Sequence, residues 1–181
     1  YGRVYTDFFK THFRLAFAEL GKPNGIWLAE DLGYRNGLFV SPSLLRELIF
    51  PFYAELVAFF HELGLPVILH SCGSVRDAMP LIVEAGFDAL NPMERKADGN
   101  DPFVFAERYG DRLAFFGGFD ARMFETNDQA LIRRELAAYL EGMKSRGARL
   151  IFASDHSLSP RVNYDTYRRA VEIYREHMYY R

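Results

Sequence analysis

The sequence predicts an α/β fold with a parallel sheet, as either a doubly wound sheet or part of an eight-fold barrel. Five short apolar segments are each followed by sequence with helical periodicity. Glycine and proline punctuate the junctions, and polar residues come directly after each apolar segment. Since the carboxyl ends of parallel strands form the working face of such folds, we expect an active site at that edge.

The five apolar segments have the length and composition of strands that are buried on both faces, as in parallel sheets covered by helices. Each segment ends at a polar sequence, which we expect at the edge of the sheet. The expected strands are residues 25–29, 67–70, 87–90, 112–116 and 148–153.

The helices between these strands are marked by their spacing and their ends. Ser41 followed by Pro42 is a strong helix start, and Pro51 within that pattern predicts a kink or two consecutive helices. Asn127 is the expected cap of a long helix, and a polar stretch at 96–101 predicts an exposed loop. The expected helices are residues 5–20, 41–63, 74–85, 102–109, 127–146 and 164–178. An apolar stripe on the last helix is expected to pack inward, and it comprises Tyr164, Tyr167, Val171, Tyr174 and Met178.

The composition fits a single domain without a nucleic-acid or membrane role. The chain has 181 residues, of which 49% are hydrophobic, and this is enough for one core. A net charge of −2 gives no basic surface for nucleic acid, and no apolar run is long enough to span a bilayer. The single cysteine excludes an internal disulfide, and no signal peptide is visible. We therefore expect a cytoplasmic protein that binds a small molecule.

The segment from Pro66 to Val75 carries a potential metal-binding pair. His70 and Cys72 lie two residues apart after an apolar strand. On an extended backbone both side chains leave the same side, and zinc favours an imidazole together with a thiolate. A lone pair of this kind is also typical of a hydrogen-bonded histidine beside a buried thiol, so both interpretations stay open.

The other strand ends carry further candidates. Glu30 and Asp31 form an acidic pair, of which we expect one member to face the crevice. Gly117 and Gly118 allow a ligand to approach the backbone closely, so they are candidate cofactor-binding residues. The remaining polar candidates are Asn91, Glu94, Asp120, Asp155 and His156.

Four stretches together resemble the uroporphyrinogen decarboxylase superfamily, which also contains cobalamin-dependent methyltransferases. The stretches are residues 66–73, 87–92, 109–118 and 154–160, which read PVILHSCG, FDALNP, YGDRLAFFGG and SDHSLSP. The resemblance implies the carboxyl-terminal five strand–helix units of a (β/α)₈ TIM-type barrel, a fold that takes about 250 residues. We expect one partial-barrel domain over residues 1–181. Because an open piece exposes its edges, we expect truncation, a completing partner or rearranged packing, with a homo-oligomer as one remedy.

The resemblance to the methyltransferase branch implies a zinc site that activates a thiol for methyl transfer from a corrinoid, which a partner protein would carry. His70 and Cys72 match two ligands of that branch, and His156 stands where it has a second cysteine. Histidine is a competent zinc ligand, so the expected further ligand is His156 or Glu94. Asp31 and Asp155 are expected to orient the ligands or to act as acid/base groups.

Two alternatives stay open beside the methyltransferase-like or demethylase-like function. The decarboxylase branch of porphyrin biosynthesis uses no metal, matches this chain at His156, and needs cationic groups to hold a tetrapyrrole's carboxylates. The other alternative is a non-catalytic fragment that acts through assembly. The candidate cations for decarboxylation are Arg35, Arg76, Arg95 and Arg161.

Overall fold

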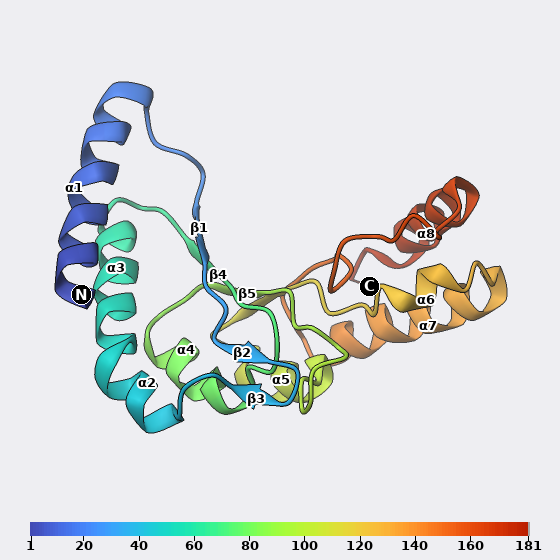
Figure 1. Ribbon diagram of the computed structural model, residues 1–181. Coiled ribbons are helices and arrows are strands. Elements are labelled where there is room, and N and C mark those ends of the chain that lie inside the picture. Colours follow the sequence, from blue (N-terminus) through green and yellow to red (C-terminus); the bar gives the residue numbers. More distant parts are fainter. Residues whose placement is uncertain (181) are drawn as a thin grey trace.

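The computed structural model describes residues 1–180 and contains a five-stranded parallel sheet (Figure 1). Its strands follow one another across the sheet in chain order, and helical sequence lies between them. In that order the strands are β1 (Ile26–Ala29), β4 (Val67–His70), β5 (Ala89–Asn91), β6 (Ala114–Phe116) and β7 (Leu150–Ile151). The predicted α/β class with a parallel sheet is confirmed, and the sheet does not close into a barrel.

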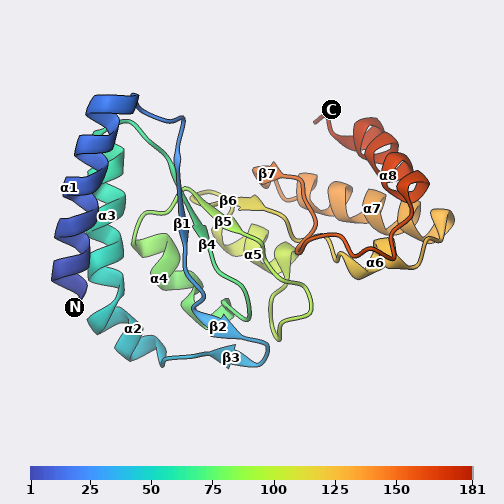
Figure 2. The same ribbon diagram turned by 45° about the horizontal axis from the view of Figure 1, so that its top comes forward.

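The helices form layers at both ends of this sheet. At the β1 end, α1 (Gly2–Leu20) lies beside α3 (Phe50–Glu62), and at the β7 end α7 (Gln129–Lys144) lies beside α8 (Tyr164–His177) (Figures 1 and 2). The other helical elements are α2 (Pro42–Leu48), the 3₁₀ turn η1 (Arg76–Ala78), α4 (Met79–Glu84), α5 (Pro102–Tyr109) and α6 (Arg122–Glu125). None of the helices within residues 1–180 is long and apolar enough to cross a membrane.

The start and the interruption of the second predicted helix are confirmed. The Ser41 hydroxyl accepts a hydrogen bond from the Leu44 amide at 3.3 Å, and Pro42 occupies the first turn. The helix then ends at Ile49, whose φ of −118° departs from the usual helical value, and Pro51 follows two residues later in the first turn of α3. Two consecutive helices result, because proline provides no amide hydrogen and favours the start of a helix.

The predicted cap of α7 is wrong by one residue. Asp128, and not Asn127, caps the helix, since its carboxylate accepts hydrogen bonds from the amides of Ala130 and Leu131, both at 3.0 Å. Asn127 instead has a left-handed backbone with φ of 52°, and its amide group binds the backbone of the segment that leads into α8. Both residue types are good caps, so the sequence alone did not separate them.

The predicted inward face of α8 is confirmed only in part. Tyr174 packs against the core and stacks on Phe152 with ring centroids 4.9 Å apart, and Val171 and Met178 are partly buried. Tyr164 and Tyr167 are exposed, and the fully packed positions are Thr166, Ala170 and Ile173. Thr166 can be buried because its hydroxyl donates to the Asn127 side chain at 2.9 Å, and a tyrosine at the helix surface keeps its hydroxyl in water.

The central strand β5 is buried at every residue, whereas burial alternates along β1, β4 and β6, which corrects the expectation that both faces of each strand are buried. In β4, Val67 and Leu69 are fully buried while Ile68 and His70 alternate with them and are partly exposed. Trp27, on the edge strand β1, is 47% exposed. The barrel is not closed, so the second face of the sheet is only partly covered. The carboxyl ends of the strands therefore lie beside a half-buried face.

Three features were not predicted. A hairpin of β2 (Gly33–Tyr34) and β3 (Gly37–Leu38) follows β1, and the short helix α6 follows β6. The stretch 96–101, predicted as an exposed loop, contains buried Ala97 and buried Asn100. The Asn100 side chain can be buried because it bonds the backbone of the loop after β4.

Candidate functional site

The site begins with a close contact between the loop after β1 and the loop after β4. The Tyr34 carbonyl accepts a hydrogen bond from the Ser74 amide at 2.8 Å. Gly73 has φ of +75°, and a Cβ there would collide with the Gly33 carbonyl, just as a Cβ on Gly33 would collide with the Ser74 carbonyl. Two glycines are therefore required for this approach, which places residues 31–34 beside residues 71–74.

Hydrogen bonds fix the two loops relative to each other. The Glu30 amide donates to the His70 carbonyl at 2.8 Å, the Leu32 amide donates to the Ser71 hydroxyl at 3.0 Å, and the Cys72 amide donates to Asp31 Oδ1 at 2.9 Å. Ser71 was not a candidate from the sequence, because nothing in a lone serine indicates a partner 39 residues away. The carboxylates of the acidic pair separate, since Asp31 turns to Cys72 while Glu30 accepts from Tyr53 on α3 at 2.8 Å.

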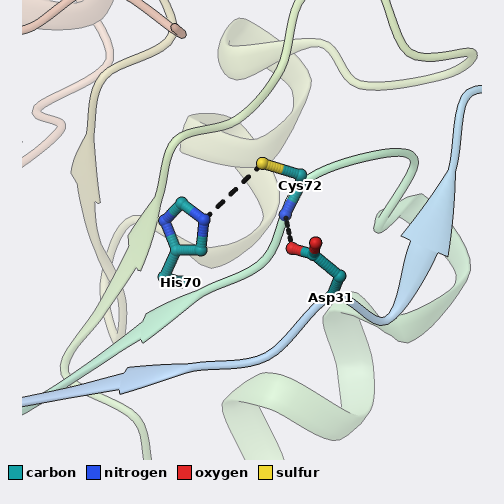
Figure 3. A group of neighbouring side chains, drawn as sticks. All are labelled: Asp31, His70 and Cys72. Atoms are coloured by element: carbon teal, nitrogen blue, oxygen red, sulfur yellow. Dashed lines mark hydrogen bonds between the residues drawn. The ribbon is translucent and has the colours of Figure 1, made fainter. Parts of the chain in front are cut away.

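This contact assembles a three-residue group of possible metal ligands (Figure 3). One donor atom each from Asp31, His70 and Cys72 lies within 4.8 Å of the others, and His70 Nε2 is 3.5 Å from Cys72 Sγ. Tetrahedral zinc, with bonds of about 2.3 Å to sulfur and about 2.0 Å to nitrogen, separates two such ligands by about 3.5 Å. The residues present therefore fit zinc in donor type and in spacing.

Aromatic rings border the group on the half-buried face of the sheet. The Trp27 ring stacks on the His70 ring with centroids 5.9 Å apart, and the Phe116 ring meets Trp27 edge-on at 5.5 Å. These rings come from β1, β4 and β6, so the wall spans the sheet. One face of the His70 ring is thus covered by an indole.

The free thiol is held in its protonated form. Partial burial raises the pKa of Cys72, and the carboxylates of Asp31 and Glu94 raise it further against the smaller opposing effect of Lys96. A cation among these groups acts in the opposite direction, because it stabilises the thiolate and relieves the repulsion between the negative charges.

Glu94, a predicted metal ligand, lies outside the three-residue group and holds the loop after β4. Its Oε2 accepts from the Gly73 amide at 2.7 Å, and Lys96 Nζ lies 3.0 Å from Oε1. Burial opposes ionisation of Glu94, but the Gly73 amide and Lys96 outweigh it and lower the pKa. The Asn100 amide donates to the Gly73 carbonyl at 2.8 Å and so supports the same loop.

Asp155 connects two other loops. Its Oδ2 accepts from the Arg95 amide at 2.8 Å and its Oδ1 from the Ala121 amide at 2.9 Å, and the residue is only 3% exposed. Both carboxylate oxygens of Asp155 thus accept hydrogen bonds from backbone amides. This structural role explains an aspartate at this position, and the sequence alone did not indicate it. His156, the next residue, is exposed and is not part of the three-residue group.

Gly117 and Gly118 approach the protein's own atoms. A Cβ on Gly117 would meet the Pro92 carbonyl oxygen at 2.6 Å, and one on Gly118 would meet the Tyr139 hydroxyl at 2.6 Å. Tight packing at the end of β6 is therefore sufficient to require both glycines. Nearby, a cavity of about 220 Å³ lies between Gly118, Tyr139 and Arg95.

Three of the arginines proposed for a polycarboxylate substrate have acidic neighbours. Arg76 pairs with Asp77 at 3.0 Å, Arg161 lies 3.6 Å from Glu125, and Arg95 lies 3.7 Å from Asp101. Arg35 is exposed in the turn between β2 and β3.

A family model described as uroporphyrinogen decarboxylase (URO-D) matches residues 27–177, which is most of the chain. The chain belongs to the uroporphyrinogen decarboxylase family. The URO-D superfamily includes both decarboxylases and methyltransferases. No curated protein matches the sequence.

One solved structure supports the fold. The chain is similar in structure to a methyltransferase from Methanosarcina mazei, with a TM-score of 0.66 and 20% identity over 91% of this chain and 45% of that chain. A Xaa-Pro dipeptidase with bound methionine gives a TM-score of 0.45 at 14% identity, over 84% of this chain and 39% of that chain. This URO-D family chain therefore spans less than half the length of either protein.

Proposed function

We propose that this URO-D family chain carries a zinc site for methyl transfer to a thiol, with Asp31, His70 and Cys72 as ligands. The observation that carries the proposal is the meeting of an oxygen, a nitrogen and a sulfur donor within 4.8 Å at the ends of β1 and β4. The set differs from the one expected from sequence, because Asp31 takes the third position in place of His156 or Glu94. The fourth position is left for the substrate's thiol.

Bound zinc would supply a positive charge that lowers the pKa of a thiol ligand, so that the thiolate forms at neutral pH. As ligands, Cys72 and Asp31 would contribute two negative charges that balance those of the ion, and a substrate thiol held beside them would keep its nucleophilic character as a thiolate. The rings of Trp27 and Phe116 form an apolar surface beside His70 that suits a methyl group. Methyl transfer then forms a carbon–sulfur bond as the donor's bond to the methyl carbon breaks.

We further propose a corrinoid as the methyl donor, carried on a partner protein that reaches the strand ends. The homo-oligomer suggested by the sequence also stays a prediction. It would cover exposed apolar side chains of α1, which include Val4, Tyr5 and Phe8.

Elemental analysis of the purified chain, after zinc supplementation and dialysis, tests the proposal. We expect about one zinc per chain, lost in His70→Ala and Cys72→Ser and reduced in Asp31→Asn. His12→Ala, which removes an exposed histidine of α1, is the matched control and should retain the metal.

Absence of zinc from the wild type, or zinc retained by both His70→Ala and Cys72→Ser, would contradict the proposal. A zinc-loaded protein should methylate 2-mercaptoethanol with methylcobalamin. Decarboxylation of uroporphyrinogen by the metal-free protein would instead favour the decarboxylase alternative, and a protein inactive in both assays would favour a role in assembly.

A further inference from the structure

The imidazole of His70 has a second polar neighbour, Asn91 on the adjacent strand. His70 and Asn91 are register partners at the carboxyl ends of β4 and β5. Side chains of register partners leave the same face of a sheet. His70 Nδ1 lies 2.7 Å from Asn91 Oδ1, so each ring nitrogen faces a different group: Nδ1 faces the amide, and Nε2 faces Cys72.

The amide of Asn91 is itself fixed. Its Nδ2 donates to the Phe116 carbonyl on β6 at 3.1 Å, and the residue is 7% exposed. Rotation of the amide by 180° would place its oxygen against that carbonyl oxygen and its NH₂ group against Nδ1. The backbone of β6 therefore determines that an oxygen, which can only accept, faces the ring.

From this geometry we infer that Asn91 is a positioning residue that selects the tautomer of His70. An acceptor at Nδ1 requires the proton on Nδ1, and the lone pair then lies on Nε2, which points toward Cys72 Sγ. Hydrogen bonds of this kind orient metal-binding histidines. The metal-binding part of this inference rests on the proposed function, whereas the tautomer is a property of the metal-free protein.

Two-bond ¹H–¹⁵N correlation spectra of histidine-labelled, metal-free protein at pH 8.5 test the tautomer directly. The chain has 5 histidines, and His70→Gln assigns the signal of His70. We expect the Nδ1–H pattern in the wild type and in Asn91→Asp, which keeps the acceptor. Asn91→Leu should show a mixture or the Nε2–H pattern. Asn36→Leu, the same change at an exposed turn, is the control.

Competition with a chromophoric chelator measures the consequence for zinc. We expect Asn91→Leu to bind zinc about 10–100-fold more weakly, with Asn91→Asp and Asn36→Leu much closer to the wild type. An Nε2–H pattern in the wild type overturns the inference even if Asn91→Leu fails to fold. An unchanged pattern in a folded Asn91→Leu does the same. The Nδ1–H pattern in a protein that binds no zinc would support the positioning role and contradict only the proposed function.

Discussion

The strand ends of this protein use polar residues in two different ways. After β5 and β7, the carboxylates of Glu94 and Asp155 accept hydrogen bonds from backbone amides of neighbouring loops. After β1 and β4, glycine contact and backbone hydrogen bonds hold the loops, and the donor atoms of His70 and Cys72 face each other. A polar residue at a strand end is therefore a stronger candidate ligand where backbone amides do not occupy all of its acceptor atoms, as for Asp31, where the Cys72 amide takes only Oδ1.

The largest expected loss of stability follows the removal of Asp155, whose carboxylate holds two loops. Asp155→Ala leaves two buried amides without an acceptor, and hydrogen bonds to a charged group contribute about 1.5–3 kcal/mol each. We expect a loss of about 3–5 kcal/mol in the free energy of unfolding, measured by urea denaturation at pH 7. Asp111→Ala, at an exposed position, should change it little. A near-wild-type Asp155→Ala would show that Asp155 is available for chemistry.

In the loops after β1 and β4, stability should depend most on the close contact between Gly33 and Gly73. Gly73→Ala combines a left-handed backbone with a collision against the Gly33 carbonyl, and we expect it to destabilise by about 2–3 kcal/mol. Gly21→Ala is the matched control, because Gly21 has φ of +83° with nothing near its Cβ position. Equal losses in the two variants would mean that the contact between the loops contributes nothing.

Glu94 connects the two sides, and its effect should depend on pH. Its pKa is lowered in the folded protein from an ordinary value of 4.5, so its contribution is complete above that value and is lost as the pH falls through the folded pKa. We expect Glu94→Gln to be less stable than the wild type by about 1–2 kcal/mol at pH 7, with the difference shrinking in acid. A difference that stays constant from pH 7 to pH 3 would contradict this role.

The smallest expected effect concerns the reactivity of Cys72. Because burial and the carboxylates of Asp31 and Glu94 raise its pKa, less thiolate is present at a given pH than for a free cysteine. Alkylation by iodoacetamide at pH 8 should therefore be slow in the metal-free protein, and about 2–5-fold faster in Asp31→Asn. Equal rates in wild type and Asp31→Asn would show that Asp31 does not act on the thiol.

Local signals predicted most of the fold and part of the candidate site. Apolar runs identify the strands, and Ser41, Pro42 and Pro51 identify the helix ends, because these effects operate within a few residues. The pairing of His70 with Cys72 is likewise local. The position of Asp31 depends on a contact with a loop 41 residues away, and Asp155 binds amides 60 and 34 residues away, so spacing alone could not assign their partners.

The stacking of Trp27 on His70 gives the site an optical reporter of its own. The chain has a single tryptophan, so its fluorescence comes from one ring, and that ring lies 5.9 Å from the imidazole. Because indole emission depends on the groups that contact the ring, the fluorescence of the protein reports on the surroundings of His70. A ligand that binds at Nε2 would therefore change the emission of Trp27.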